Sequence, residues 1–189
     1  MCTIRLATPD DASGILAVYA PYVRDTAISF ETIVPSVGEF AARIAEIGKT
    51  YPYLAAVSQG ESIGYTYASR HRPRDAYRYN VELSIYLKPD FHGKGVAQRL
   101  YNCLFDILTE QGFVNAYVGV TVPNGQSIRF HEKEGFTPIG VFQKTGWKFD
   151  RWHDVAWLGK SLRQGEPGKI RRIGELPREW VEDILAKYN

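Results

Sequence analysis

Two features near the middle of the chain have residue types that could do chemistry: a strand carboxylate, Glu82, and a glycine-bearing loop that opens a helix. Apolar and polar residues alternate over Val81–Lys88, which predicts a strand. Apolar residues then return at helical spacing over Val96–Leu108. The first N–H groups of a helix have no internal partner, and the helix dipole makes that end positive. Gly93 and Gly95, just before this helix, therefore form a candidate cradle for a phosphate group.

Neither the glycine loop nor Glu82 is enough by itself to indicate a function. The loop lacks the spacing of the nucleotide P-loop and of the dinucleotide fingerprint, so glycines that only tighten a turn are an equal alternative. Glu82, taken by itself, is best interpreted as an ordinary exposed strand carboxylate. Asn124 and His131 lie downstream, and Asn124 between a proline and a glycine could simply form a turn. The combination of these residues with the loop favours a functional site.

The rest of the sequence predicts a mixed α/β chain whose elements position these residues. Strands are expected over residues 3–7, 53–58, 63–68, 81–88, 115–121, 139–144 and 152–159. Helices are expected after a Thr8 cap, after a capping box at Ser36–Glu39, and from the glycine loop to Gly112. A short helix is expected between Asn124 and Gly135. Residues 27–34 and 69–76 are predicted to be loops.

Composition narrows the class of protein. The chain has 189 residues, 44% of them hydrophobic, which suits one domain with a substantial core. A formal net charge of +2 gives no electrostatic case for nucleic-acid binding, and no apolar run approaches a membrane span. The N-terminus lacks a signal-peptide core, and two cysteines make no disulfide framework. We therefore expect a cytoplasmic protein with no nucleic-acid or membrane partner.

Histidine spacing bears on metal binding. His71, His92 and His153 have no metal-ligand spacing with each other or with a cysteine, so no metal site is expected.

The C-terminal segment differs in character from the rest. Residues 161–189 begin with basic residues among glycines and a proline, which is typical of a linker, and residues 1–160 are expected to form the main domain. Pro177 then opens a short helix with an apolar side from Trp180 to Tyr188. That side needs a cover, either the domain itself or a partner subunit, and we expect a homodimer.

Several motifs resemble those of the GCN5-related N-acetyltransferase (GNAT) superfamily, especially its phosphinothricin and methionine sulfoximine acetyltransferase branch. The superfamily signature is Gln/Arg-x-x-Gly-x-Gly/Ala after a strand, and this chain has His92-x-x-Gly95-x-Ala97 there, with His92 in place of the usual first residue. The match to the branch covers roughly residues 3–158. Its motifs are Phe30-Glu31-Thr32, Tyr51-Pro52, Tyr77-Arg78-Tyr79-Asn80-Val81-Glu82, Ile128-Arg129-Phe130-His131-Glu132, Gly135-Phe136 and Gly146-Trp147-Lys148-Phe149-Asp150-Arg151-Trp152-His153-Asp154-Val155.

The resemblance implies a fold and a cofactor site. The fold would be a central, mostly antiparallel, splayed mixed sheet flanked by helices. Acetyl-CoA would be the co-substrate, its pantetheine arm pairing with one strand like an added peptide and its pyrophosphate meeting the glycine loop. The implied cofactor-binding residues are Ile85, Tyr86, Leu87, Gly93, Lys94, Gly95, Val96, Ala97, Gln98, Asn124, Ser127 and Lys133.

The resemblance also implies an acceptor site. Glu82 would deprotonate the acceptor amine, and His131 would either protonate the departing thiolate or only pack. Arg72 would hold a carboxylate of the acceptor. The implied substrate-binding residues are Phe30, Arg72, Asp75, Ala76, Tyr77 and Glu82. A core position for Phe30 and a solvated arginine-rich loop at residues 70–74 are the alternatives.

The expected activity is acetyl transfer to the amine of a small amino-acid-like acceptor such as phosphinothricin or methionine sulfoximine. The alternative acceptors are a polyamine, an antibiotic amine or a protein N-terminus. A non-catalytic CoA-binding module is the alternative from a different class.

Overall fold

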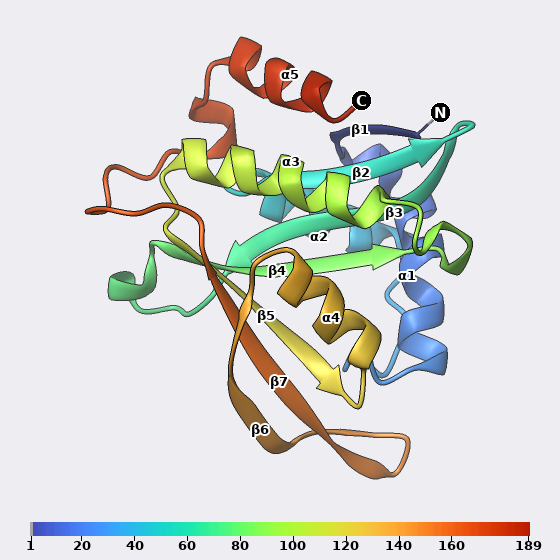
Figure 1. Cartoon of the computed structure of the whole chain (residues 1–189). Coiled ribbons are helices and arrows are strands. Elements are labelled where there is room, and N and C mark those ends of the chain that lie inside the picture. Colours follow the sequence, from blue (N-terminus) through green and yellow to red (C-terminus); the bar gives the residue numbers. More distant parts are fainter. Residues whose placement is uncertain (1) are drawn as a thin grey trace.

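A computed structural model describes residues 2–189 of the chain (Figure 1). Seven strands form one sheet in the order β1-β2-β3-β4-β5-β7-β6. All neighbouring strands are antiparallel except β4 and β5, which are parallel. The strands are β1 (Cys2–Leu6), β2 (Tyr53–Ser58), β3 (Glu61–Arg70), β4 (Asn80–Leu87), β5 (Asn115–Val122), β6 (Thr137–Lys148) and β7 (Arg151–Ser161). The helices are α1 (Ala12–Asp25), α2 (Val37–Gly48), α3 (Val96–Gln111), α4 (Gly125–Lys133) and α5 (Arg178–Lys187).

The alternation of side chains along the strands builds a separate core on each face of the sheet. On β2, Leu54 and Ala56 join the core that includes α3, whereas Tyr53 and Ala55 join the core that includes α1 and α2. Figure 1 shows α3 crossing one face of the sheet with α5 above it, while α1 and α2 lie behind the other face. The expected fold class, a mostly antiparallel mixed sheet flanked by helices, is confirmed.

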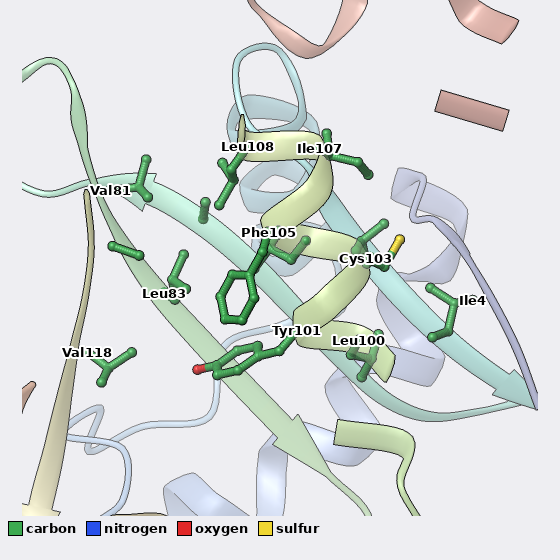
Figure 2. Packing of buried hydrophobic residues seen from close by; sticks show 14 of the residues in the cluster. Ile4, Val81, Leu83, Leu100, Tyr101, Cys103, Phe105, Ile107, Leu108 and Val118 are labelled. Atoms are coloured by element: carbon green, nitrogen blue, oxygen red, sulfur yellow. The ribbon is translucent and has the colours of Figure 1, made fainter. Parts of the chain in front are cut away.

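Helix α3 is fixed in place by large side chains on its inner side. Tyr101 and Phe105 point from the helix toward Leu83 of β4 and Val118 of β5 (Figure 2). Tyr101 is fully buried and Phe105 nearly so. Burying each aromatic side chain contributes about 1.5–3 kcal/mol to folding. This packing holds the first turn of α3 beside the end of β4.

The parallel pair β4 and β5 separates soon after it starts. Its ladder has three residue pairs, Asn80–Asn115, Val81–Ala116 and Glu82–Tyr117. Beyond them β5 stays paired with β7 over its whole length, and β4 stays paired with β3 as far as Leu87. The two arrowheads consequently point apart in Figure 1. Glu82 is thus the last residue of β4 that pairs with β5.

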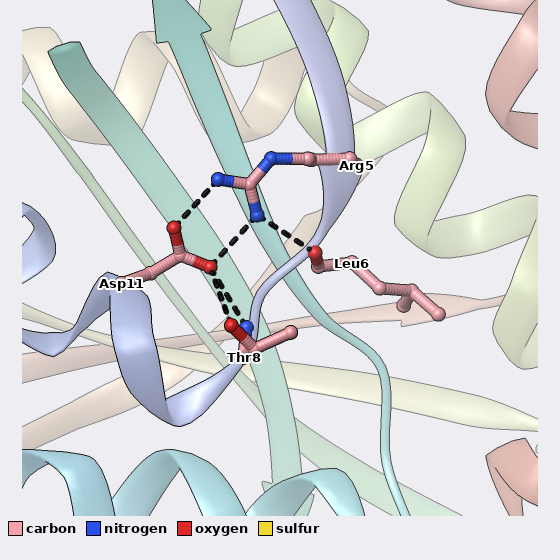
Figure 3. Close-up of polar contacts among 4 residues, drawn as sticks. All are labelled: Arg5, Leu6, Thr8 and Asp11. Carbon is pink, nitrogen blue, oxygen red and sulfur yellow. Dashed lines mark hydrogen bonds and ion pairs between the residues drawn. The ribbon is translucent and has the colours of Figure 1, made fainter. Parts of the chain in front are cut away.

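A network of polar contacts joins β1 to the start of α1 (Figure 3). The Arg5 guanidinium donates two hydrogen bonds to the Asp11 carboxylate, at 2.7 and 2.6 Å. The same carboxylate accepts a hydrogen bond from the Thr8 backbone N–H at 2.8 Å. These contacts lower the pKa of Asp11, and the hydrogen bonds from Arg5 are the largest cause. The predicted Thr8 start is present, but its first turn, Pro9–Asp11, is a 3₁₀ helix.

The C-terminal segment packs onto the domain through α5. Val181 is buried, and Ile184, Leu185 and Tyr188 pack against the core that contains α3. The Asn189 side chain accepts a hydrogen bond from the Ile4 N–H at 2.6 Å and donates one to the Ile4 carbonyl at 3.0 Å. These bonds satisfy backbone groups on the outer edge of β1, so the chain end covers one edge of the sheet.

Strands β3, β6 and β7 are longer than expected, and β3 extends two residues beyond its expected range at each end. Strand β6 starts two residues earlier and ends four residues later than expected, and β7 starts one residue earlier and ends two residues later. The β6–β7 hairpin is longer because its pairing continues past an irregularity between Phe142 and Gly146. Helix α3 begins at Val96, where the helical spacing of apolar residues begins in the sequence, after a 3₁₀ turn over Pro89–Phe91 and two glycines with positive φ. Across residues 2–189, no helix is long and apolar enough to cross a membrane.

Candidate active site

A cavity of about 430 Å³ opens where β4 and β5 part. Its walls come from both faces of the sheet, because α1 and the following loop contribute Tyr22 and Ile28 while α3 and α4 contribute the opposite wall. The lining residues are Tyr22, Ile28, Ile85, Leu87, Phe91, His92, Gly93, Gly95, Ala97, Gln98, Asn124, Gln126, Ser127, Phe130, Lys133 and Glu134. The cavity therefore passes through the gap in the sheet.

The glycine loop forms the end of this cavity at the start of α3. Gly93 has φ +71° and Gly95 has φ +77°, a conformation that residues with a Cβ adopt only at a cost. A Cβ built on either glycine would meet no protein atom within 4 Å, so the space in front of the backbone is open. The first N–H groups of α3 lie here, at the positive end of the helix dipole. The loop is thus shaped to receive a bulky anion, which supports the cradle over a mere turn.

The edge of β4 that faces the gap presents backbone groups from alternate residues. The Lys88 N–H donates to the Ile63 carbonyl of the β3 side at 2.8 Å. Backbone N–H and C=O groups of successive residues point to opposite sides of a strand. Those of Tyr86 therefore also point toward β3, and those of Ile85 and Leu87 point toward the gap. Ile85 and Leu87 line the cavity, whereas the Tyr86 side chain enters the core on the α1 face. Of these three predicted contacts, Ile85 and Leu87 are therefore the ones placed at the cavity.

Helix α4 contributes the other predicted cofactor residues. Asn124 caps it, since its side-chain oxygen accepts a hydrogen bond from the Ser127 N–H at 3.1 Å. Asn124, Ser127 and Lys133 all line the cavity. Asn124 thus combines the predicted site position with the local structural role that was its alternative.

The other predicted residues of the glycine loop and the first turn of α3 have different surroundings. Gly95, Ala97 and Gln98 line the cavity, but Val96 is 4% exposed and packs in the core. Lys94 is exposed, with its Nζ 5.4 Å from the Phe91 ring centroid. Any contact of Val96 with an anion would be through the backbone, whereas the exposed Lys94 can also offer its ammonium group.

His131 lies away from the cavity in a closed set of hydrogen bonds. Its Nε2 is 2.9 Å from the Tyr101 hydroxyl, and its Nδ1 is 2.7 Å from the Ser127 carbonyl. A carbonyl only accepts, so Nδ1 carries the proton and Nε2 accepts from the tyrosine. His131 is 4% exposed, and burial lowers its pKa. This geometry fits the packing alternative and opposes a role as proton donor to a leaving group.

Glu82 stands at the point where the strands separate. Its side chain is 37% exposed, and its Oε2 lies 3.5 Å from His71 Nδ1. Burial raises the pKa of the Glu82 carboxyl, while the neighbouring His71 and Arg72 oppose part of that rise. A carboxyl with a raised pKa is a better base toward an ammonium group than one at its ordinary value.

The predicted acceptor residues fall into two groups. Arg72 and Tyr77 lie together near Glu82, with the Arg72 guanidinium 5.7 Å from the Tyr77 ring centroid and its Nε donating to His71. Asp75, Ala76 and Tyr77 form a 3₁₀ turn, and Asp75 pairs with Arg78. Phe30 instead packs on the β6–β7 hairpin, where a Cβ on Gly146 would lie 2.4 Å from its ring.

Several cavity residues were not predicted as site residues. One of them is Tyr22, whose hydroxyl donates to the Leu87 carbonyl and lies 3.4 Å from His92 Nε2. His92 was considered only as a replaced signature residue and a poor metal ligand, although its place in the glycine loop was a usable signal. Glu134 also lines the cavity, and burial raises its pKa.

A second hollow, of about 640 Å³, lies at the far end of α3. Its charged residues are Glu110, Arg163, Lys169 and Arg171, and Arg171 donates to the Glu110 carbonyl at 2.7 Å. Its lining does not combine a partly buried carboxylate with a glycine loop at the start of a helix, as the first cavity and its surroundings do. Within the described residues 2–189, no three or more His, Cys, Asp or Glu residues cluster as metal ligands would.

Comparison with known proteins uses most of the chain and agrees with a site for an acetyl-CoA-dependent enzyme. The family described as acetyltransferase (GNAT) domain matches residues 4–157. A phosphinothricin N-acetyltransferase of Alcaligenes faecalis is 36% identical over 87% of this chain and 85% of its own length. An L-methionine sulfoximine/L-methionine sulfone acetyltransferase of Pseudomonas paraeruginosa is 34% identical over 85% of this chain and 94% of its own. The crystal structure of a GNAT superfamily phosphinothricin acetyltransferase from Sinorhizobium meliloti in complex with acetyl-CoA superposes with a TM-score of 0.83, at 36% identity, covering 88% of this chain and 93% of that one.

Proposed function

Because the chain belongs to the acetyltransferase (GNAT) family, it is an acetyl-CoA-dependent N-acetyltransferase, and we propose that its acceptor is the α-amine of a small amino acid such as phosphinothricin or methionine sulfoximine. The proposal extends the activities of the relatives to this chain. It also rests on the position of a half-buried carboxylate at the gap between β4 and β5.

In this proposal acetyl-CoA lies in the cavity with its pyrophosphate at the start of α3. The open space in front of Gly93 and Gly95 accommodates the phosphates, and the helix dipole attracts their charge. The backbone groups of Ile85 and Leu87 that face the gap are available to the pantetheine amides, as a neighbouring strand would be. Lys133 on the cavity wall adds positive charge for the nucleotide end. The thioester then reaches the point where β4 leaves β5.

Glu82 acts as the general base of the reaction. An amino-acid amine is protonated in neutral water and must lose a proton before it can attack. Glu82 takes that proton, the amine nitrogen bonds to the thioester carbonyl carbon, and the carbon–sulfur bond breaks. The electron pair leaves with the CoA sulfur. The nitrogen then loses its second proton to water to give the amide, the thiolate takes a proton from water, and Glu82 releases its proton to solvent. Holding the two substrates together supplies much of the rate.

The acceptor carboxylate is recognised by Arg72. A guanidinium can donate two parallel hydrogen bonds to a carboxylate. Arg72 lies beside His71, whose Nδ1 is 3.5 Å from the base, and against Tyr77, which can form a wall of the acceptor site. Asp75 and Ala76 hold the turn that presents Tyr77. Phe30, which packs on the β6–β7 hairpin, is proposed as a second wall of the acceptor site.

His131 has a packing role in this mechanism. Its two ring nitrogens are occupied by Tyr101 and Ser127, and it positions α4 against α3. The departing sulfur therefore needs no acid from this histidine.

The single observation that carries the proposal is the position of Glu82 at the last β4–β5 pair, with a raised pKa. The test is the release of free CoA thiol by the purified protein with acetyl-CoA and a panel of amines. We expect turnover with phosphinothricin and methionine sulfoximine. Turnover with spermidine, an aminoglycoside or a peptide N-terminus but with neither amino acid would refute the acceptor assignment. Acetyl-CoA binding without turnover on any amine would indicate a non-catalytic module.

We further propose a homodimer through the outer edge of the sheet. Strand β6 is an edge strand, and it exposes Ile139, Val141 and Phe142 by 61, 54 and 52%. An exposed edge with contiguous apolar side chains is a surface that pairs with another chain. Light scattering after gel filtration is expected to give twice the chain mass, and Val141→Asp to give the monomer. A wild-type monomer at micromolar concentration would contradict the dimer.

A further inference from the structure

His71 lies directly beside the proposed base, Glu82. It follows the last residue of β3, and Ser69, two residues before it, pairs with Glu82. Residues two apart on one strand share a face, so His71 is a diagonal neighbour of Glu82 across the β3–β4 pair. His71 Nδ1 and Glu82 Oε2 lie 3.5 Å apart.

An aromatic surround holds the imidazole ring. It stacks on Tyr117 with ring centroids 4.6 Å apart and an interplanar angle of 30°. Trp157 and Tyr77 approach it edge-on, with centroids 6.1 and 6.3 Å away. Only 13% of the His71 side chain is exposed. The ring therefore has one orientation, and Tyr117, the β5 partner of Glu82, helps to fix it.

The hydrogen-bond pattern defines which nitrogen carries the proton. Arg72 Nε, which can only donate, lies 3.4 Å from His71 Nε2. Nε2 must therefore accept, and Nδ1 carries the hydrogen. Nδ1 is buried and makes no regular hydrogen bond with any residue in the range 2–189. The carboxylate oxygen Glu82 Oε2 lies 3.5 Å from Nδ1, and a movement of about 0.5 Å would bring the pair to ordinary hydrogen-bond distance.

We infer that His71 is a positioning residue for the base: its Nδ1–H holds the Glu82 carboxylate toward the gap and favours the ionised form that accepts the amine proton. This role rests on the proposed function. Three groups face the carboxylate: His71 from the end of β3, Arg72 from the following loop, and Tyr67 from β3. Arg72 and His71 both favour the ionised form of Glu82, and they form one chain, Arg72 to His71 to Glu82.

Two substitutions separate the N–H from the ring. His71→Phe keeps an aromatic ring against Tyr117 and Trp157 but removes both nitrogens. His71→Asn loses the ring but places an amide N–H near the position of Nδ1. Thermal unfolding of both variants establishes that they are folded before any rate is compared.

The expected results concern the pH dependence of the reaction. His71→Phe is expected to lower kcat/KM about 5- to 10-fold near neutral pH and to move the acid limb of the profile to higher pH. The direction follows because loss of the donor raises the pKa of the base. His71→Asn is expected to restore both values toward those of the wild type. Equal defects in the two variants, or an unchanged profile in His71→Phe, would overturn the inference.

A measurement without turnover keeps this inference separate from the proposed function. The carboxyl carbon of Glu82, labelled with ¹³C and assigned with Glu82→Gln, is titrated by NMR in the wild type and in His71→Phe without any substrate. An upward shift of the Glu82 titration in His71→Phe supports the inference, and an unchanged titration overturns it. Undiminished turnover of Glu82→Gln would instead refute the proposed base and leave this titration result standing.

Discussion

Replacing Gly95 by alanine tests whether the glycine loop binds a phosphate or only turns the chain. Gly95 has φ +77°, so a Cβ there strains the backbone by about 1 kcal/mol. That strain is expected to lower Tm by about 2–4 °C in a chain of this size. The new methyl group meets no protein atom within 4 Å and occupies the space proposed for the pyrophosphate. Displacing the phosphate from one backbone N–H would weaken acetyl-CoA binding about 10- to 100-fold.

Gly60 provides a matched control for the strain. It has φ +81° in the β2–β3 turn, and a Cβ on it also meets nothing within 4 Å, but it does not line the cavity. Gly60→Ala should therefore lose a similar amount of stability and bind acetyl-CoA as the wild type does. Calorimetric titration of acetyl-CoA into both variants gives the comparison. Equal affinities in Gly95→Ala, Gly60→Ala and the wild type would refute the phosphate cradle and leave the glycines as turn residues.

Two further predictions concern stability. Asp11→Asn should lower the free energy of unfolding by about 1 kcal/mol at neutral pH, because the partly exposed Arg5–Asp11 pair is lost. The pKa of Asp11 is lowered in the folded state, so the stability that this carboxylate contributes is present above its ordinary pKa of about 4 and is lost as the pH falls through its pKa in the folded protein. Urea unfolding should show a difference in stability between the wild type and Asp11→Asn at pH 7 that disappears by about pH 2. A difference that persists at that pH would contradict this account. Truncation after Leu162 removes the buried Leu176 and Val181 and should cost about 3 kcal/mol or more; an unchanged melting temperature would show that α5 is not part of the folded unit and that residues 1–160 suffice.

Local patterns predicted most of the fold. The alternation along β4 and the helical spacing after Val96 both correspond to real elements, as does the capping box at Ser36, where the Glu39 N–H donates to the serine hydroxyl. The gap between β4 and β5 had no local signal, because it arises from the competing pairings of β4 with β3 and of β5 with β7. The resemblance to a family supplied that feature.

The site shows the same division between local and tertiary information. Gly93 and Gly95 carried a local signal, and the structure places both at the cavity. His131 looked chemically capable in the sequence, but its surroundings are set by Tyr101, which lies thirty positions earlier. His71 was noticed only for its lack of metal-ligand spacing, because its proximity to Glu82 depends on the register of β3 against β4.

The turnover of Glu82→Gln tests the central claim most directly. The substitution preserves the size of the side chain and removes the base at the gap between β4 and β5. With acetyl-CoA and methionine sulfoximine at neutral pH, kcat should fall about 10²-fold or more, while the affinity for acetyl-CoA measured by calorimetry stays the same. A variant that binds acetyl-CoA normally and releases CoA at the wild-type rate would show that Glu82 is not the base.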